Sequence, residues 1–259
     1  MTVKGSGIDS VFAIENREAA GEVLLVCEHA SNHFPDEFGT LGLSQEQRQA
    51  HIAWDPGALG LARGLSQHLD AALVHAGVSR LVYDLNRAPD APGAMPQQSE
   101  AHVIPGNANL TASQRTHRTE AVYLPFHTAL HGEIARRIAV GRAPVIVTIH
   151  SFTPIYFGKP RAVEFGVIHD EDAGLAQAVV LAAQSMTSLR VALNEPYSAA
   201  DSVTHTLRLQ ATPYGLRNVM LEVRNDLLTD DAAVAQMAET ISAVVREAIS
   251  PTNHKKAAC

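Results

Sequence analysis

Short apolar runs alternate along this chain with longer amphipathic stretches, and this alternation limits the fold more than any other sequence feature. The clearest runs are EVLLVC at 22–27, PVIVTI at 144–149 and NVMLEV at 218–223. Continuous apolar runs of this length are typical of strands that are buried on both faces, as in a parallel sheet. Further strands are predicted at 72–76 (ALVHA), 80–85 (RLVYDL) and 163–169 (VEFGVIH).

Helical patterns separate these runs. Asp55 is a favourable N-cap, and Pro56 suits the first turn of a helix that begins there. Thr111 or Ser113 would cap a second helix, which Pro125 is expected to bend. The helices are predicted from residue 56 onwards and over 112–140, 171–187 and 229–249. Strands that alternate with helices predict an α/β fold with a mostly parallel or mixed sheet flanked by helices.

The chain is predicted to form one catalytic domain over residues 1–259, because no repeat or linker divides it. Residues 1–20 and 252–259 are expected to be flexible ends. The stretch 86–111 is rich in proline and glycine and lacks periodicity. A long irregular segment inside a compact enzyme is usually a binding loop or a lid. A second irregular stretch covers 194–216.

Charge and composition exclude several classes of function. The net charge is −7, and no segment concentrates lysine and arginine. Binding to nucleic acid or to an anionic membrane needs local positive charge, so neither partner is expected. No run of about 18 apolar residues predicts a membrane span. The first residues lack the apolar core of a signal peptide, and Cys27 and Cys259 are too few for a disulfide framework. We therefore expect a cytoplasmic protein, either a monomer or a homodimer.

Polar and ionisable residues follow several of the predicted strands. His29 follows the first strand, Asn86 and Arg87 follow 80–85, and His150 follows 144–149, while Glu222 lies near the end of the last strand. Ligand sites in open α/β sheets form beyond the carboxyl ends of the strands. The sequence therefore predicts a site at this edge of the sheet.

Structural roles stay open for each of these residues. Arg87 could pair with Asp84 or Asp90 at the surface. Glu222 could form a structural ion pair with Arg224, since a carboxylate inside an apolar strand needs a partner. His127 and His131 share a helix face at a spacing that can hold zinc, but no glutamate accompanies them in an HExxH pattern.

At these positions the sequence resembles the N-formylglutamate amidohydrolase family, which is related to the zinc carboxypeptidases and aspartoacylases. The matching segments, in the order of the family, are VCEHASNHFP, HIAWDPGA, YDLNRAPD, YLPFH, TIHSFTP, NEPYS and LEVRNDL, between residues 22 and 228. The resemblance implies a zinc carboxypeptidase-like, or phosphorylase/hydrolase-like, fold. It also implies hydrolysis of a small anionic N-acyl amino acid such as N-formylglutamate, in amino-acid catabolism.

The resemblance also implies roles for individual residues. His29 and His150 would bind Zn²⁺ or another divalent metal, and Glu222 would act as the general base. Asp55 is the preferred third ligand, with Glu28 and Asn32 as alternatives, because the related enzymes carry HxxE where this chain has His29 and Asn32. The other predicted roles are orientation of the ligand or stabilisation of the oxyanion by His127, and substrate binding by Asn86, Arg87, Arg224 and Ser31.

One segment departs from the family pattern. Members of the family usually carry Arg-His where this chain has Leu209 and Gln210. This departure keeps two alternatives open. One is an amidase or peptidase of the same fold with another substrate, and the other is a homologue that binds a small molecule without catalysis.

Overall fold

The computed structural model describes residues 3–4, 11–171 and 173–250. The predicted flexible end 252–259, and most of residues 1–10, lie outside this part. The other predicted flexible end, 1–20, is wrong in part, because residues 12–15 form a hydrogen-bonded strand of the main sheet. The described residues form one eight-stranded mixed sheet, ordered β1-β2-β4-β3-β7-β12-β10-β11, with two small hairpins beside it. The strands of the sheet are β1 (Val3–Lys4), β2 (Phe12–Glu15), β3 (Val23–Cys27), β4 (Ala72–Ala76), β7 (Val145–Phe152), β10 (Phe165–Ile168), β11 (Val191–Leu193) and β12 (Asn218–Arg224). The hairpins are β5 (Gln98–Ser99) with β6 (His102–Val103) and β8 (Ile155–Tyr156) with β9 (Lys159–Pro160).

Four central strands run parallel, in the order β4-β3-β7-β12, so their carboxyl ends meet at one edge. Strand β10 runs antiparallel to β12, and β2 runs antiparallel to β4. The continuous apolar runs of β3, β7 and β12 are buried along their whole length, because helices cover both faces of the sheet.

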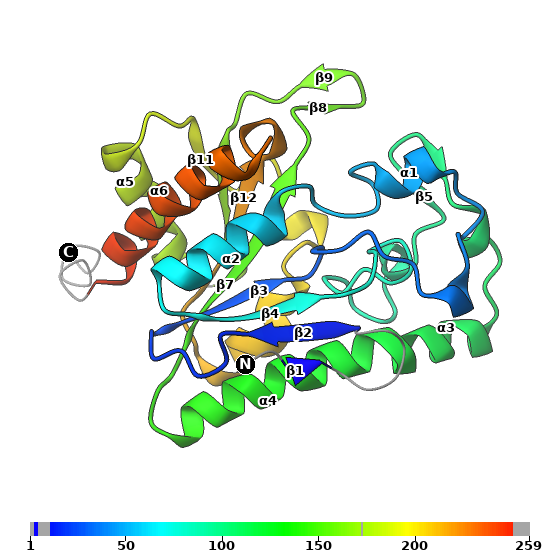
Figure 1. The fold of residues 1–259 in the computed structure, drawn as a ribbon, viewed down its shortest axis with the longest axis horizontal. Helices are drawn as coiled ribbons and strands as arrows, with labels where there is room; N and C mark the ends of the chain where they lie inside the picture. Colours follow the sequence, from blue (N-terminus) through cyan, green and yellow to red (C-terminus); the bar gives the residue numbers. More distant parts are fainter. Residues whose placement is uncertain (1–2, 5–10, 172, 251–259) are drawn as a thin grey trace.

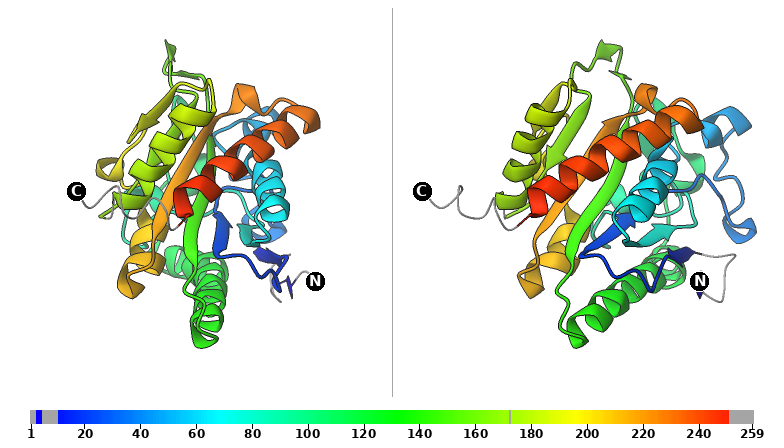
Figure 2. Two further views of the ribbon diagram at one scale, coloured as in Figure 1. Left: turned by 90° about the vertical axis from the view of Figure 1, so that its left-hand side faces the viewer. Right: turned by 60° about the vertical axis from the view of Figure 1, so that its left-hand side comes forward.

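Helices pack on both faces of the sheet (Figures 1 and 2). On one face, α4 packs Phe126, Leu130 and Ile134 into a cluster with Leu24 and Val26 of β3. The opposite face of β3 packs in a second cluster against α2, α5 and α6. The helices are α1 (Gln45–Gln49), α2 (Ala58–His68), α3 (Ala112–Arg118), α4 (Leu124–Ala139), α5 (Gly174–Met186) and α6 (Asp231–Ile249). Within the described residues, no helix combines the length and apolar character needed to cross a bilayer.

The structure confirms the α/β class and five of the six predicted strands. The strand predicted at 80–85 is wrong, since this segment is a series of turns in which Val82 donates to the carbonyl oxygen of Ser79. Its apolar side chains are nevertheless buried, because the Ser79 hydroxyl donates to the carbonyl oxygen of Ala53 and holds the turn against the core. The apolar run therefore reports burial rather than extended structure.

One helix start differs from the prediction, and a second predicted helix contains an irregular turn. Helix α2 begins at Ala58 after Gly57, which adopts a left-handed conformation, and no side chain caps it. The Asp55 carboxylate is thus not used as an N-cap. Of the predicted region 112–140, residues 112–139 are helical, with Thr111 as the predicted cap, but a π-helical turn at Thr119–Tyr123 precedes Pro125. Pro125 therefore falls in the first turn of α4.

Candidate active site

The carboxyl ends of the parallel strands bring three predicted residues together. His29 follows β3, His150 lies in β7, and Glu222 lies opposite His150 in the ladder between β7 and β12. Asp55 reaches the same place because its backbone N–H donates to the His29 carbonyl oxygen at 2.9 Å, just before α2. All four side chains are almost completely buried.

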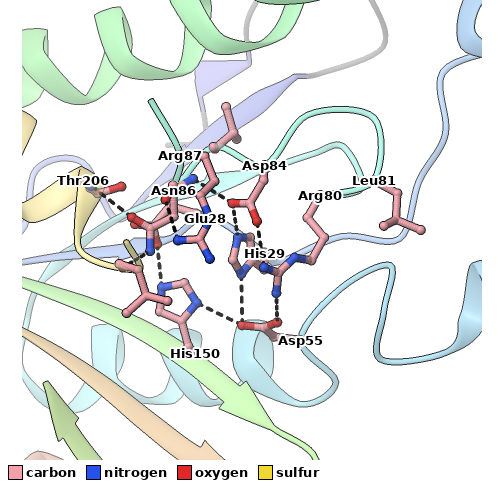
Figure 3. Close-up of polar contacts among 12 residues, drawn as sticks. Glu28, His29, Asp55, Arg80, Leu81, Asp84, Asn86, Arg87, His150 and Thr206 are labelled. Carbon is pink, nitrogen blue, oxygen red and sulfur yellow. Dashed lines mark hydrogen bonds and ion pairs between the residues drawn. The ribbon is translucent and has the colours of Figure 1, made fainter. Parts of the chain in front are cut away.

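Three of these residues surround one point. The Asp55 Oδ2 atom lies 3.3 Å from His29 Nδ1 and 2.9 Å from His150 Nδ1. The potential ligand atoms of the three residues all lie within 4.8 Å of one another. Figure 3 shows both imidazoles directed at the Asp55 carboxylate.

The outer nitrogens of both imidazoles face further carboxylates. His29 Nε2 lies 2.7 Å from Asp84 Oδ1, and His150 Nε2 lies 3.2 Å from Glu28 Oε2. These carboxylates favour a proton on Nε2, which leaves the Nδ1 lone pairs directed at Asp55. Two lone pairs and a carboxylate oxygen repel each other unless protons or a cation lie between them. Metal-binding histidines commonly donate their other N–H to a carboxylate in this way.

The pKa shifts of the two histidines also indicate that this site stabilises a positive charge. Burial disfavours the charged form of His150, but the Glu28 and Asp55 carboxylates outweigh it and raise the pKa of His150 well above its usual value. Burial and Arg80 likewise oppose protonation of His29, yet Asp84 and Asp55 raise its pKa. The site therefore attracts positive charge. Two imidazoles and a carboxylate are a donor set that suits Zn²⁺, so the residues present fit a divalent metal.

Arg80 connects two of the carboxylates, and sequence reasoning missed it. Its guanidinium lies 2.7 Å from Asp84 Oδ2 and 3.4 Å from Asp55 Oδ1. Although burial opposes ionisation of Asp84, Arg80 and His29 hold its pKa well below the usual range. Both carboxylates therefore stay ionised and keep their orientation toward His29. The only signal in the sequence was the i,i+4 spacing of Arg80 and Asp84, which was obscured by the predicted strand.

Glu222 has a different environment from the other carboxylates. Burial raises the pKa of Glu222 to about 7, His150 opposes this shift, and Asp55 adds to it. The Oε2 atom of Glu222 has no hydrogen-bond partner among the described residues. The alternative ion pair with Arg224 does not form, because Arg224 instead contacts Asp226 at 2.8 Å and Glu164 at 3.4 Å.

A cavity opens above these residues. His29, Asp55, His150 and Glu222 line it together with Arg80. The irregular stretch 86–111 contributes further lining residues, and so does the segment 151–156. These lining residues are Asn86, Arg87, Ser99, Glu100, Ser151, Phe152, Thr153 and Tyr156. The candidate metal ligands and Glu222 thus lie together on one side of the cavity, and the end of β7 and the neighbouring loops complete its lining.

Arg87 lies in this wall without a carboxylate partner. No ion pair of the described residues includes Arg87, so the predicted alternative pairs with Asp84 and Asp90 do not form. Its guanidinium donates to backbone carbonyl oxygens of Asn86 and Ser202. The Asn86 side chain fastens the 203–206 segment beside it, since its Oδ1 accepts from the backbone N–H of Thr206 at 3.0 Å and its Nδ2 donates to Val203.

Three predicted residues do not line the cavity. The Ser31 hydroxyl accepts from the backbone N–H of His33 at 3.0 Å. Arg224 lies at the end of β12 against its two carboxylates. His127 is buried behind the wall, where Nε2 donates to the Leu85 carbonyl oxygen at 2.9 Å.

The two residues that depart from the family pattern, Leu209 and Gln210, do not line the cavity either. Gln210 is buried, and its Nε2 donates to His127 Nδ1 at 3.2 Å, whereas Leu209 is exposed. Burial lowers the pKa of His127 to about 4, so the ring is neutral and accepts this hydrogen bond. His131 does not join His127, and its Nε2 instead lies 3.3 Å from the Tyr214 hydroxyl.

Of the alternatives for the third ligand, Asp55 joins the two imidazoles, whereas Glu28 faces the outer nitrogen of His150. Asn32 is not among the lining residues of the cavity.

Known proteins resemble this chain in sequence and in fold. The family model described as N-formylglutamate amidohydrolase matches residues 21–229. The crystal structure of gene product Atu2144 from Agrobacterium tumefaciens is 50% identical, with a TM-score of 0.91 over 93% of this chain and 96% of that one. The N-formylglutamate amidohydrolase from Ralstonia eutropha JMP134 is 19% identical, with a TM-score of 0.70 over 92% and 96% of the two chains, and shows the shared fold. No curated protein matches the sequence.

Proposed function

Because the chain belongs to the N-formylglutamate amidohydrolase family, we propose that it hydrolyses N-formylglutamate to formate and glutamate in a metal-dependent reaction. Amide hydrolysis of an N-acyl amino acid follows from the family. One observation supports the finer proposal: three buried potential ligands surround one point beside a carboxylate that has an unpaired oxygen.

In this proposal His29, Asp55 and His150 hold Zn²⁺ or another divalent ion. Such an ion supplies Lewis-acid chemistry, polarising an acyl carbonyl and lowering the pKa of a water molecule. Asp84 orients the His29 imidazole through its outer N–H group, and the Glu28 carboxylate lies 3.2 Å from the outer nitrogen of His150.

Glu222 moves the protons of the reaction. Its carboxylate accepts a proton from the water that attacks the formyl carbon, and it then donates that proton to the amide nitrogen as the C–N bond breaks. A general base works best when its pKa lies near the working pH, and burial brings the pKa of Glu222 to about 7. The products are formate and the free amino acid.

Arg87 binds the α-carboxylate of the substrate. A guanidinium offers two parallel N–H donors that match a carboxylate, and Arg87 has no protein carboxylate to compete for them. Asn86 keeps the neighbouring 203–206 segment in place, so its contribution is to position Arg87.

Formate release from N-formylglutamate tests this proposal. The purified protein is assayed as prepared, after dialysis against a chelator, and after zinc is restored. We expect activity to disappear with the metal and to return with it. The Glu222→Gln variant should be inactive and the Glu239→Gln variant active, since Glu239 is exposed on α6. Full activity in the chelated protein, or in Glu222→Gln, would refute the proposed chemistry.

A second candidate keeps the reaction and changes the substrate. Leu209 and Gln210, where the family carries Arg-His, favour it. A panel of N-formyl, N-acetyl and N-succinyl amino acids distinguishes the two candidates. Tight binding of N-formylglutamate to the zinc-loaded protein without hydrolysis would instead indicate a binding homologue. A cytoplasmic location, and action as a monomer or homodimer, are further parts of the proposal.

A further inference from the structure

Hydrolysis of an amide places negative charge on the carbonyl oxygen, and active sites stabilise this charge with hydrogen-bond donors that are already in place. The sequence predicted His127 for this role. His127 does not line the cavity, because its ring is buried where Nε2 donates to the Leu85 carbonyl oxygen. A side-chain donor for the carbonyl oxygen therefore has to come from another residue.

The uncharged donors of the cavity lining are mostly committed to the protein itself. Ser151 Oγ and Thr153 Oγ1 donate to backbone carbonyl oxygens at 2.7 and 3.0 Å. The Tyr197 hydroxyl differs, because its partner is a donor, the Arg161 guanidinium. Burial and the Glu222 carboxylate raise the pKa of Tyr197 to about 12, so the hydroxyl keeps its proton. That proton is available to a ligand in the cavity.

A glycine lets the segment that carries Tyr197 pack beside the proposed general base. Gly166 of β10 pairs with Glu222 of β12, and partners in an antiparallel ladder project to the same face of the sheet. A Cβ atom at position 166 would clash with the Glu195 carbonyl oxygen and would lie 3.2 Å from Pro196 Cδ. The backbone before Tyr197 therefore fills this space, on the face from which Glu222 projects.

Hydrogen bonds on both sides hold this segment. Before Tyr197, the Asn194 Oδ1 atom accepts from the backbone N–H of His169 at 3.3 Å. After it, the backbone N–H of Ser198 donates to Asp201 Oδ2 at 2.8 Å. The Tyr197 ring also packs against the hydrophobic cluster that α4 forms with β3. The hydroxyl is thus held in place by the fold, as preorganised stabilisation requires.

Arg161 contacts both the ring and the hydroxyl of Tyr197. Its guanidinium carbon lies 4.8 Å from the ring centroid, and its donors reach the hydroxyl oxygen. A positive charge beside that oxygen polarises the O–H bond and makes it a stronger donor. Arg224 Nη1 in turn donates to the Arg161 carbonyl oxygen at 3.1 Å. Arg224, for which the sequence predicted direct substrate binding, therefore supports the residue that holds Tyr197.

We propose that the Tyr197 hydroxyl donates a hydrogen bond to the carbonyl oxygen of the scissile amide as negative charge develops on it, and that Arg161 is a positioning residue for this hydroxyl. The inference rests on the proposed function for its reaction. Tyr197 keeps its proton throughout, so Glu222 still carries out every proton transfer. Removing the hydroxyl should slow turnover without weakening substrate binding.

Steady-state formate release from N-formylglutamate by the zinc-loaded protein measures the two effects separately. Tyr197→Phe removes only the hydroxyl. It should lower kcat by about 10- to 100-fold and change KM by less than about 3-fold, because the lost hydrogen bond forms only as charge develops. Tyr214→Phe is the matched control, since Tyr214 is exposed and its hydroxyl contacts His131 away from the cavity.

Binding of a tetrahedral anion gives a readout that does not depend on turnover. In N-phosphorylglutamate an anionic tetrahedral phosphorus replaces the formyl carbon, and glutamate lacks this group. Isothermal titration calorimetry should show that Tyr197→Phe weakens N-phosphorylglutamate binding by about 10- to 100-fold and glutamate binding by less than about 2-fold.

A double-mutant comparison tests the role of Arg161. Arg161→Met should lower kcat by about 10-fold in the wild-type protein and by less than about 2-fold in Tyr197→Phe, because its effect passes through the hydroxyl. Arg161→Lys should recover part of the loss. Equal losses in both backgrounds would reject the positioning role.

The outcomes separate this inference from the proposed function. An unchanged kcat in Tyr197→Phe, or a raised KM alone, would overturn the inference while hydrolysis by the wild-type protein keeps the proposed function intact. Failure of the wild-type protein to hydrolyse any N-acyl amino acid would reject the proposed function. In that case, N-phosphorylglutamate binding that depends on the Tyr197 hydroxyl would still support the inference, and binding that is independent of it would overturn it.

Discussion

The buried carboxylate of Glu222 leads to a prediction about stability as well as activity. Replacing Glu222 with glutamine should abolish hydrolysis and at the same time stabilise the metal-free protein at alkaline pH. The native site holds Glu222 beside the ionised Asp55 carboxylate in a buried environment. An amide of the same shape carries no charge, so it avoids the cost of ionising a carboxyl group there.

The sign and size follow from the pKa of Glu222, which is raised from 4.5 to about 7. The native protein therefore keeps this proton where the unfolded chain has lost it. The stabilising contribution is complete below about pH 4.5 and is lost as pH rises through 7. At about 1.4 kcal/mol for each tenfold change in proton affinity, Glu222→Gln should gain roughly 3 kcal/mol at pH 8 and under about 1 kcal/mol at pH 5.

Urea unfolding in the presence of a chelator measures this difference at both pH values. Glu239→Gln, on the exposed surface of α6, is the control and should change the free energy of unfolding by less than about 0.5 kcal/mol. Zinc should reduce the advantage of Glu222→Gln, because a cation stabilises the ionised carboxylate. An equal gain at pH 5 and pH 8, or none at pH 8, would refute the argument from burial.

Three further predictions concern the metal and the substrate. His150→Ala should reduce bound zinc from about one ion per chain to near zero while Glu222→Gln retains it; equal metal content in both variants, measured by atomic absorption, would contradict the assigned ligands. Asp84→Asn should weaken zinc binding by about 10- to 100-fold, because it removes the carboxylate that orients His29. Competition with a chromophoric chelator measures this loss of affinity, and an unchanged affinity would exclude an orienting role for Asp84. Arg87→Lys should raise KM for N-formylglutamate by about 10-fold and change kcat by less than about 2-fold, because a lysine cannot bind a carboxylate in the bidentate geometry. A fall in kcat alone would place Arg87 in the chemical step.

The local pattern of the sequence was sufficient to predict which edge of the sheet carries the candidate site. His29, His150 and Glu222 each lie at or near the end of a strong apolar run, and parallel strands bring such ends together. Asp55 came from the resemblance alone, since its position before Pro56 suggested only a helix cap. Its carboxylate is instead directed at the two imidazoles.

The residues that sequence reasoning missed depend on contacts between distant segments. The apolar run at 80–85 gives the same pattern whether it is a buried strand or a buried turn, and only as a turn does Arg80 reach Asp55. Strand alternation puts Arg224 on the same face as Glu222. However, Asp226 and Glu164 bind its guanidinium at the end of the strand. No local pattern reports such a competition between neighbours.

The departure at Gln210 acts on the site through other residues. Gln210 donates to His127 Nδ1, and His127 Nε2 donates to the Leu85 carbonyl oxygen, directly before Asn86 and Arg87. Because the glutamine amide provides an N–H donor to the neutral ring, His127 keeps the tautomer that holds Leu85 in place. Gln210 therefore supports the substrate-binding segment indirectly, through His127 and Leu85. A change of substrate choice caused by this departure would act through that support, because Gln210 does not line the cavity.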